Sequence, residues 1–561
     1  MALELIPYHK MSVLIIEDLA EMRSSMKSML HNIGVQTLES VNNGEDALKR
    51  LRDKDYDLVF SDYELGRGKD GQQILEEVRF NTLVRPSAVF IMVTAAQTQE
   101  MVMGALEFEP DGYIAKPVTL ELLKTRLVRI IRTKDIFKEI NLALDDKDIE
   151  GALNACNRLA MEKPKFALPA YRIKGKILIA EERFDEAKDI YETVLGIKRV
   201  AWAILGMAKV HFFSKEYEEA QDLLESLAKT KAKYVEAQDW LAKSLEEQGK
   251  YKAAQKVLMA AIEQSPKSVR RQQHLARIAD KNGDIDTLWK SCRRALALGQ
   301  NSCFKSVDVV IGLAKSLQPK IKGGSMRDKK LCTTEALNLI ETARTKFELT
   351  TITAIKCALI EAETLANSGK AEEGKLAYSA AEAIINSAAN LTFDDKLDIF
   401  NTKLQFESEE VALTYGTELL KAIGNNKRLQ TKYHRLIEIY LSNRPDERLA
   451  KIKQRGDELL ERDDIEDALE LYLRACGYNN ADEDIFLGTL TAIIGRFKKG
   501  RPDRKLTMKC DELFKKMLSL PESDPRYATI QQLKFQWDEI TGDDSSSDDA
   551  SSPAKKESSD E

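Results

Sequence analysis

The stretch Val13-Leu14-Ile15-Ile16-Glu17-Asp18 places two acidic residues directly after a short apolar run. Polar residues follow similar runs at Leu58-Val59-Phe60-Ser61-Asp62, at Val89-Phe90-Ile91-Met92-Val93-Thr94 and at Gly112-Tyr113-Ile114-Ala115-Lys116. Short apolar runs bounded by turn signals are typical of buried parallel strands. Helical patterns lie between them, as in residues 22–30. This alternation predicts a doubly wound α/β domain.

The polar residues at the strand ends suggest a chemistry. Ligands of such sheets gather outside the carboxyl ends of the strands, where Asp18, Asp62, Thr94 and Lys116 are expected to meet. Carboxylates brought together repel one another unless a hard cation or a bound proton relieves them. Mg²⁺ prefers oxygen donors and keeps several waters, so it is the natural candidate. Asp62 could then attack a phosphoryl group as a carboxylate nucleophile.

Residues 11–134 resemble the receiver domain of two-component response regulators. The resemblance rests on the acidic pair at 17–18, on Asp62 forty-four residues after Asp18, on Thr94-Ala95, and on Asp111-Gly112-Tyr113-Ile114-Ala115-Lys116-Pro117. It implies a flavodoxin-like sheet of five parallel strands and phosphorylation of Asp62, with a sensor histidine kinase or phosphotransfer protein as the phosphodonor. Mg²⁺ is the only cofactor that it implies.

The resemblance also implies which residues hold the metal. Asp18 and Asp62 bind Mg²⁺ directly, Glu17 acts through water, and the main-chain carbonyl of Glu64 completes the metal shell. The loop at 64–71, Glu-Leu-Gly-Arg-Gly-Lys-Asp-Gly, departs from the Met-Pro that many receivers carry there. This departure leaves the lifetime of the phosphorylated state open.

Three further residues match positions that respond to the phosphoryl group in this family. Thr94 is the switch hydroxyl, Tyr113 the switch aromatic residue and Lys116 the lysine that contacts the phosphoryl group. An isolated Asp after an apolar strand is more often a helix cap or a turn residue. A degenerate receiver that keeps its fold and loses its chemistry typically lacks an acid or the lysine, and none is missing here.

Composition restricts the partners. The formal net charge is −6, and the last twenty-one residues hold seven acids against two lysines, so the rest of the chain carries only −1. Such a body offers no broad basic surface for nucleic acid. No apolar stretch is long enough for a membrane span, and residues 1–10 do not resemble a signal peptide. The seven scattered cysteines include no Cys-x-x-Cys. We therefore expect a cytoplasmic protein without a nucleic-acid or membrane partner.

Helix formers dominate from about residue 139, and a pattern repeats at about thirty-four residues. Its members are Ile149 and Ala152, Phe184 and Ala187, Tyr217 and Ala220, Tyr251 and Ala254, and Ile285 and Leu288. A period of this length is typical of helix-turn-helix solenoids. The segment resembles tetratricopeptide repeats, and a further unit is recognisable at Ile465 and Ala468.

These observations predict four segments: a receiver at 11–134, tetratricopeptide repeats at 135–300, divergent helical repeats at 301–541 that continue an all-α superhelix, and a disordered acidic tail at 542–561. Residues 119–144 read as a nearly continuous helix, which would join the receiver stiffly to the first repeat. Residues 318–330, with one proline and two glycines, are expected to form a loop or hinge.

The function predicted is a response regulator without its own catalytic output domain. Its solenoid would hold a protein partner, such as another signalling protein, in a way that depends on Asp62. One alternative is a scaffold whose receiver works without phosphorylation. The other is a cyclic-dinucleotide signalling enzyme, suggested only by the triplet Glu335-Ala336-Leu337.

Overall fold

The computed structural model describes residues 6–95, 108–230, 234–424, 426–441, 445–476, 482–500 and 503–541. The acidic tail expected at 542–561 therefore lies outside the described residues. The chain divides into two compact units, Met1–Ala389 and Asn390–Glu561. The four segment boundaries expected above stay predictions. Among the described helices, none combines the length and the apolar character that crossing a membrane requires.

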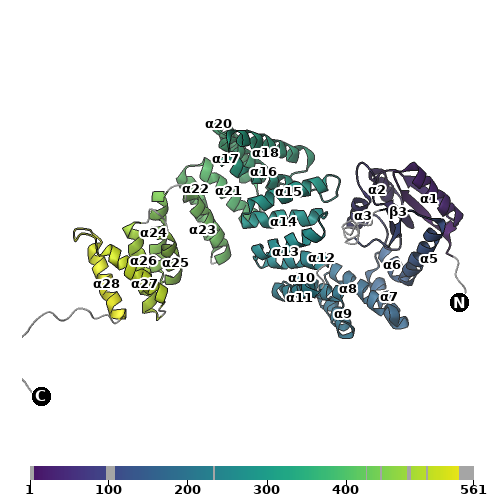
Figure 1. The fold of residues 1–561 in the computed structure, drawn as a ribbon, viewed down its shortest axis with the longest axis horizontal. Coiled ribbons are helices and arrows are strands. Elements are labelled where there is room, and N and C mark those ends of the chain that lie inside the picture. The colour runs from purple at the N-terminus through teal and green to yellow at the C-terminus, as the bar shows by residue number, and fades with distance from the viewer. Residues whose placement is uncertain are drawn as a thin grey trace, which may run out of the picture. The chain divides into compact units, whose positions relative to one another are not determined.

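The first unit begins with a five-stranded parallel sheet of order β2-β1-β3-β4-β5. Figure 1 labels its central strand β3 beside helices α1, α2 and α3. Its strands are β1 Ser12–Ile16, β2 Thr37–Val41, β3 Leu58–Asp62, β4 Val89–Thr94 and β5 Gly112–Ala115. The central strand β3 is buried along its whole length. Since all strands run in one direction, their carboxyl ends lie at one edge, as the sequence predicted.

Helices cover both faces of the sheet. Those described are α1 Ala20–Asn32, α2 Gly44–Asp53, α3 Gly71–Phe80 and α5 Leu120–Ile136, preceded by a short 3-10 turn at Tyr8–Lys10. Val13 and Ile15 of β1 pack with the helices α1 and α5. Leu14 and Ile16 pack with α2 and α3 on the opposite face. This division follows from the two-residue period of a strand and explains why the strands are apolar throughout.

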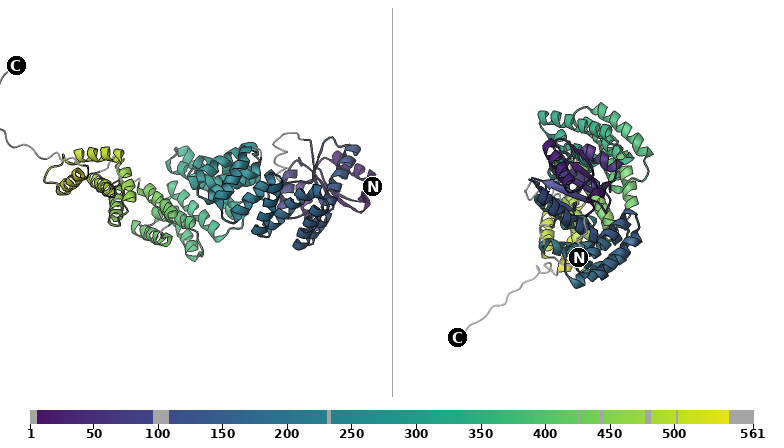
Figure 2. Two further views of the ribbon diagram at one scale, coloured as in Figure 1. Left: turned by 90° about the horizontal axis from the view of Figure 1, so that it is seen from below. Right: turned by 90° about the vertical axis from the view of Figure 1, so that its right-hand side faces the viewer.

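The rest of the first unit is helical (Figure 2). Its α-helices are α6 Lys138–Asp145, α7 Ile149–Glu162, α8 Ala167–Ala180, α9 Phe184–Ile197, α10 Ala201–Phe213, α11 Tyr217–Thr230, α12 Val235–Glu247, α13 Tyr251–Gln264, α14 Val269–Asn282, α15 Ile285–Gly299, α16 Val307–Ser316, α17 Gln318–Gly323, α18 Met326–Lys346, α19 Thr351–Asn367 and α20 Ala371–Ser387. A 3-10 turn at Pro164–Phe166 precedes α8.

The repeat pattern read from the sequence is confirmed. Each leading residue is the first residue of a helix, from Ile149 in α7 to Ile285 in α15. The small residues three positions later, Ala152, Ala187, Ala220 and Ala254, are fully buried. Small side chains at these positions let the two helices of a repeat approach closely.

A conformational feature accompanies each of these helix pairs. The residue two positions before the second helix has a positive φ, and these residues are Lys147, Glu182, Lys215, Gly249 and Gly283. The left-handed conformation ends the first helix and turns the chain back. Only two of the five are glycine, so the residue types at these positions hardly indicate the turn.

The join between α5 and α6 differs from the prediction. The helix is not continuous, because Phe137 leaves the helical conformation at φ −99° and ψ 14°. Helix α5 buries Leu127 in the receiver core, whereas α6 buries Ile140 in the repeat core. One straight helix would not serve both cores, and the interruption lets Phe137 pack edge-on against Phe166.

The prediction of a loop or hinge at 318–330 is wrong for most of that segment. Residues Gln318–Gly323 form α17, and α18 begins at Met326. Pro319 lies in the first turn of α17, where its missing N–H is not needed. Ile321 is fully buried, so the segment is fixed against its neighbours.

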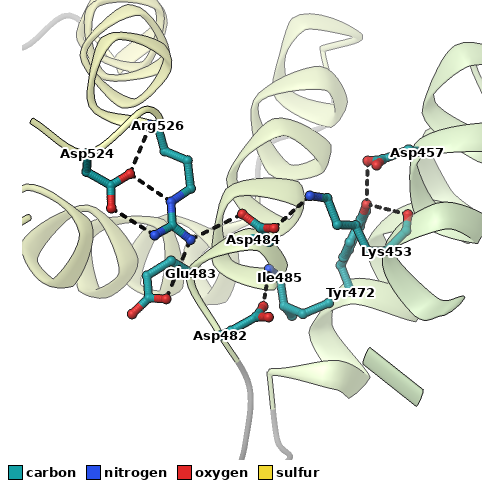
Figure 3. A network of polar contacts seen from close by, with 9 residues as sticks. All are labelled: Lys453, Asp457, Tyr472, Asp482, Glu483, Asp484, Ile485, Asp524 and Arg526. Carbon is teal, nitrogen blue, oxygen red and sulfur yellow. Dashed lines mark hydrogen bonds and ion pairs between the residues drawn. The ribbon is translucent and has the colours of Figure 1, made fainter. Parts of the chain in front are cut away.

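The second unit contains α21 Phe393–Phe406, α22 Glu409–Ile423, α23 Lys427–Leu441, α24 Pro445–Glu461, α25 Ile465–Ala475, α26 Glu483–Lys498, α27 Arg504–Met517 and α28 Tyr527–Thr541. Tyr472 is fully buried, and its hydroxyl lies 2.7 Å from the carboxylate of Asp457 (Figure 3). Asp484 accepts hydrogen bonds from Lys453 at 2.7 Å and from Arg526 at 3.2 Å. These contacts connect α24, α25 and α26 with the segment before α28.

Candidate functional site

Asp62 is the last residue of β3 and lies at the carboxyl edge of the sheet, with 5% of its surface exposed. The Lys116 ammonium, directly after β5, donates a hydrogen bond of 2.8 Å to Asp62 Oδ2. The same ammonium donates to Glu17 Oε2 at 2.9 Å. The parallel topology thus brings together three side chains that lie 45 and 54 residues apart along the chain.

Burial and charge oppose each other at this cluster. Burial raises the pKa of Asp62, and the neighbouring Glu17 adds to this, while the hydrogen bond from Lys116 lowers it only in part. Burial alone would lower the pKa of Lys116, but its hydrogen bonds to Asp62 and Glu17 outweigh that effect and raise it. Lys116 therefore stays an ammonium and favours the ionised form of the carboxylate beside it.

Asp18 completes an acidic group with Glu17 and Asp62. Each of the three residues offers a carboxylate oxygen, and these oxygens lie within 4.8 Å of one another. The Lys116 ammonium pairs with Glu17 and Asp62, so three carboxylates lie beside one paired ammonium and the group suits a divalent cation. Hard oxygen donors of this kind fit Mg²⁺.

Arg23 supports the loop that carries these acids, and sequence reasoning missed it. Its guanidinium donates to the main-chain oxygens of Glu17 at 2.7 Å and of Asp18 at 3.2 Å. Because the guanidinium binds main-chain atoms, no side-chain motif could have indicated this role.

The other predicted residues lie around the cluster. The main-chain N–H of Glu64 hydrogen-bonds the Asp62 carboxylate and helps to keep it ionised. Thr94 ends β4, and its main-chain oxygen accepts a hydrogen bond of 2.8 Å from the N–H of Lys116. The Tyr113 hydroxyl is buried with no hydrogen-bond partner among the described residues, and burial raises its pKa to about 12.

The triplet Glu335-Ala336-Leu337 lies inside the long helix α18. Ala336 is fully buried, and Glu335 pairs with Arg293 of α15 at 2.5 Å. These contacts are those of an ordinary repeat helix.

Comparison with known proteins agrees with this geometry. A family model of the response regulator receiver domain matches residues 13–128, and tetratricopeptide repeat models match residues 178–243 and 236–268. The protein is thus a response regulator with an N-terminal receiver domain followed by tetratricopeptide repeats.

Curated relatives show the receiver family directly. The chain is 30% identical over 128 residues to the chemotaxis protein CheY-3 of Vibrio cholerae serotype O1, covering 23% of this chain and 97% of that protein. It is 28% identical over 120 residues to the chemotaxis protein CheY of Pseudomonas aeruginosa, covering 21% of this chain and 95% of that protein. The chain belongs to the response regulator receiver family through this N-terminal part.

Among solved structures, the receiver domain of a modulated diguanylate cyclase from Desulfovibrio desulfuricans G20 is similar. It shares 26% identity over 22% of this chain and 97% of that one, with a TM-score of 0.21.

Proposed function

We propose that this response regulator accepts a phosphoryl group on Asp62 and responds by binding a protein through its helical repeats. The observation that carries the proposal is the cluster at the sheet edge, where Lys116 holds Asp62 beside two further carboxylates. A buried carboxylate with a fixed cation and oxygen donors for a metal is the arrangement that aspartyl-phosphate chemistry needs.

The reaction follows from the positions of these side chains. An oxygen of the ionised Asp62 carboxylate attacks the phosphorus of a phosphohistidine or of a small phosphodonor. The new O–P bond forms as the bond to the donor atom breaks, and the electron pair leaves with the donor. Lys116, already 2.8 Å from Oδ2, remains close enough to offset the charge of the transferred oxygens.

Asp18, Asp62 and the main-chain carbonyl of Glu64 would hold Mg²⁺, with Glu17 acting through water. When bound, the ion supplies charge stabilisation to the oxygens of the phosphoryl group. Thr94 and Tyr113 are the proposed switch residues, since Thr94 ends the neighbouring strand and the Tyr113 ring packs beside the sheet.

The proposed output is protein binding. Tetratricopeptide-type helix pairs create extended surfaces for peptides or partner helices. The phosphodonor would be a sensor histidine kinase or a phosphotransfer protein, and the target another signalling protein of the same cytoplasmic pathway. Neither nucleic acid nor a membrane is proposed as a partner, and no catalytic output is proposed.

Phosphorylation can be tested by incubating the full chain with acetyl phosphate and Mg²⁺ and measuring its intact mass. The wild-type chain should gain one phosphoryl group that alkali removes. Asp62→Asn should not gain it, and Asp18→Ala should lose the dependence on Mg²⁺ together with most of the product. Asp55→Asn is the matched control, because its exposed carboxylate lies near the opposite end of β3. Phosphorylation of Asp62→Asn at the wild-type level would show that Asp62 is not the phosphoacceptor.

A second measurement separates the rival functions. Capture of partners by the full chain and by Asp62→Asn, each with and without acetyl phosphate, tests whether binding depends on Asp62. Equal capture in all four samples would favour a phosphorylation-independent scaffold. Turnover of cyclic dinucleotides by the purified chain would favour the enzyme.

A further inference from the structure

The loop that follows Asp62 is attached to the solenoid. The Lys69 ammonium donates to the main-chain oxygen of Asn301 at 2.6 Å, and the Asn301 side-chain amide donates to the main-chain oxygen of Gly68 at 2.7 Å. Gln73, in the first turn of α3, donates to the main-chain oxygen of Leu298 at 3.3 Å. These polar contacts join segments of the first unit that are more than 220 residues apart in the sequence.

Aromatic contacts extend the same interface. The rings of Phe80, at the end of α3, and Phe304 meet edge to face with their centroids 5.1 Å apart. The guanidinium of Arg270 lies 5.2 Å from the Phe304 ring. We call the contacts of Gly68, Lys69, Gln73 and Phe80 with Leu298, Asn301 and Phe304 the receiver clamp.

The clamp is anchored on the receiver side by a buried acid. Lys69 also pairs with Glu77 at 2.9 Å, and Arg52 pairs with the other oxygen of that carboxylate. Glu77 is only 5% exposed. Lys69 therefore connects Glu77 of α3 with Asn301 of the solenoid, and a movement of the loop that carries Lys69 would change both contacts.

The same loop lies against the acidic cluster with little free volume. A Cβ atom on Gly66 would lie 3.1 Å from Asp18 Oδ2, and one on Gly68 would lie 2.8 Å from a carboxylate oxygen of Glu45. A Cβ atom on Gly71 would come within 2.0 Å of the main-chain oxygen of Asp62. The loop thus runs beside Asp18 at Gly66 and reaches the solenoid at Gly68 and Lys69.

We infer that the receiver clamp is a switch, which the phosphoryl group on Asp62 opens. A phosphoryl group and its cation would bind beside Asp18 and Asp62, next to Gly66, and their binding would shift the loop at 66–69. That movement displaces the Gly68 carbonyl and the Lys69 ammonium from Asn301. This inference rests on the proposed phosphorylation of Asp62 and adds how it reaches the repeats. The signal crosses a non-covalent contact as well as the interrupted join between α5 and α6.

Coupling of this kind is reciprocal at equilibrium, because the phosphoryl group favours the open clamp only if the open clamp favours the phosphoryl group. Beryllofluoride, a tetrahedral anion that mimics a phosphoryl group, allows the coupling to be measured as a dissociation constant. Asn301→Ala and Phe304→Ala weaken the clamp from the solenoid side without touching the acidic cluster.

The first experiment measures hydrogen exchange of residues 298–306 in the full chain with Mg²⁺ alone and with Mg²⁺ plus beryllofluoride. These residues do not touch the acceptor, so their exchange reports on the clamp. Beryllofluoride should raise it about fivefold or more, a typical size for coupling between sites. Mg²⁺ alone should leave it unchanged. Unchanged exchange with bound beryllofluoride, or a full effect of Mg²⁺ alone, would overturn the inference.

The second experiment measures the affinity for beryllofluoride by calorimetry. Asn301→Ala and Phe304→Ala should tighten binding about fivefold, as reciprocity requires. The control Phe535→Ala, which changes an exposed ring in the second unit, should bind as the wild type does. If Phe304→Ala fails to fold, Asn301→Ala decides alone, since its side chain is only partly buried and its hydrogen bond to Gly68 belongs to the clamp. Unchanged or weaker binding in the variants refutes the clamp. Absence of both beryllofluoride binding and phosphorylation in the wild type refutes the proposed function, and the switch with it.

Discussion

At the scale of single residues, the surroundings of Asp62 act on it in opposite directions. Burial and Glu17 raise its pKa, and Lys116 opposes them. In the unfolded chain an Asp titrates near about 3.9. Because the folded pKa is higher, the stability that the protonated carboxyl contributes is fully present below the unfolded value. That stability is lost as the pH rises through the folded value, so at neutral pH the ionised Asp62 weakens folding.

This reasoning predicts that Asp62→Asn stabilises the unphosphorylated protein at pH 7 in the absence of Mg²⁺. The amide removes a charge from the crowded cluster, while Lys116 keeps its hydrogen bond to Glu17. Thermal unfolding should show a higher midpoint for the variant, with the difference vanishing below about pH 4. Asp55→Asn serves as the control, since its carboxylate is exposed. A lower midpoint for Asp62→Asn at pH 7 would show that the ion pair with Lys116 outweighs burial.

At the scale of elements, the repeats depend on the turn between their paired helices. Five successive pairs place a residue of positive φ two positions before the second helix. The left-handed conformation costs a residue with a Cβ atom roughly 1 to 2 kcal/mol, and glycine avoids that cost. Three of the five turns nevertheless carry lysine or glutamate, so the contacts of the surrounding helices must offset the cost of the left-handed conformation there.

We expect Gly283→Ala to lower the free energy of unfolding of the first unit by about 1 to 2 kcal/mol, because φ there is 70°. Lys215→Gly, at the matching turn with φ 64°, should not destabilise and should relieve the strained conformation. Urea unfolding followed by circular dichroism measures both. Equal losses in the two variants would mean that side-chain contacts, and not φ, govern these turns.

At the scale of the whole molecule, the chain forms two compact units, each stabilised by its own buried contacts. In the first unit Glu246 accepts hydrogen bonds from His274 and Lys281 and pairs with Arg277, each within 2.9 Å. Burial opposes its charge, but the hydrogen bonds from His274 and Lys281 and the charge of Arg277 outweigh burial and lower its pKa to about 2. In the second unit, Cβ atoms on Gly456 and Gly488 would each lie 2.3 Å from the Tyr472 ring.

Two transitions are therefore expected when the full chain is heated in a calorimeter. Glu246→Gln should lower the free energy of unfolding of the first unit by about 1.5 to 3 kcal/mol and shift only the transition of that unit to lower temperature. Gly488→Ala should lower the free energy of unfolding of the second unit by about 1 to 3 kcal/mol and shift only its transition, because the added methyl group overlaps the Tyr472 ring. Gly196→Ala is the control, since no atom lies within 4 Å of the added Cβ. A single transition that both variants shift would contradict independent unfolding.

The Glu246→Gln effect should also depend on pH. A folded pKa of about 2 lies below the unfolded value, so the stability that Glu246 contributes is present above about pH 4.3. It is lost as the pH falls toward the folded value. The first transitions of the wild type and the variant should thus converge in acid.

The sequence by itself determined the elements whose signals are local. Apolar runs predicted the strands of the sheet, and a period of about thirty-four residues located the paired helices and their buried alanines. The acids and Lys116 could be placed at one edge because parallel strands share a direction. Each of these patterns recurs within a few residues or at a constant period, so it can be recognised in the sequence without knowledge of tertiary contacts.

Only the tertiary structure decided the features that depend on distant or backbone partners. The clamp joins Lys69 to Asn301, 232 residues away, through a main-chain oxygen that no residue type reveals. The helix from the receiver breaks at Phe137, where one side packs in the receiver core and the other in the repeat core. Pro319 lies in the first turn of α17, and the burial of Ile321 makes this segment a helix and not a loop. Packing settles such choices, since the free energy of these contacts exists only once both partners are in place.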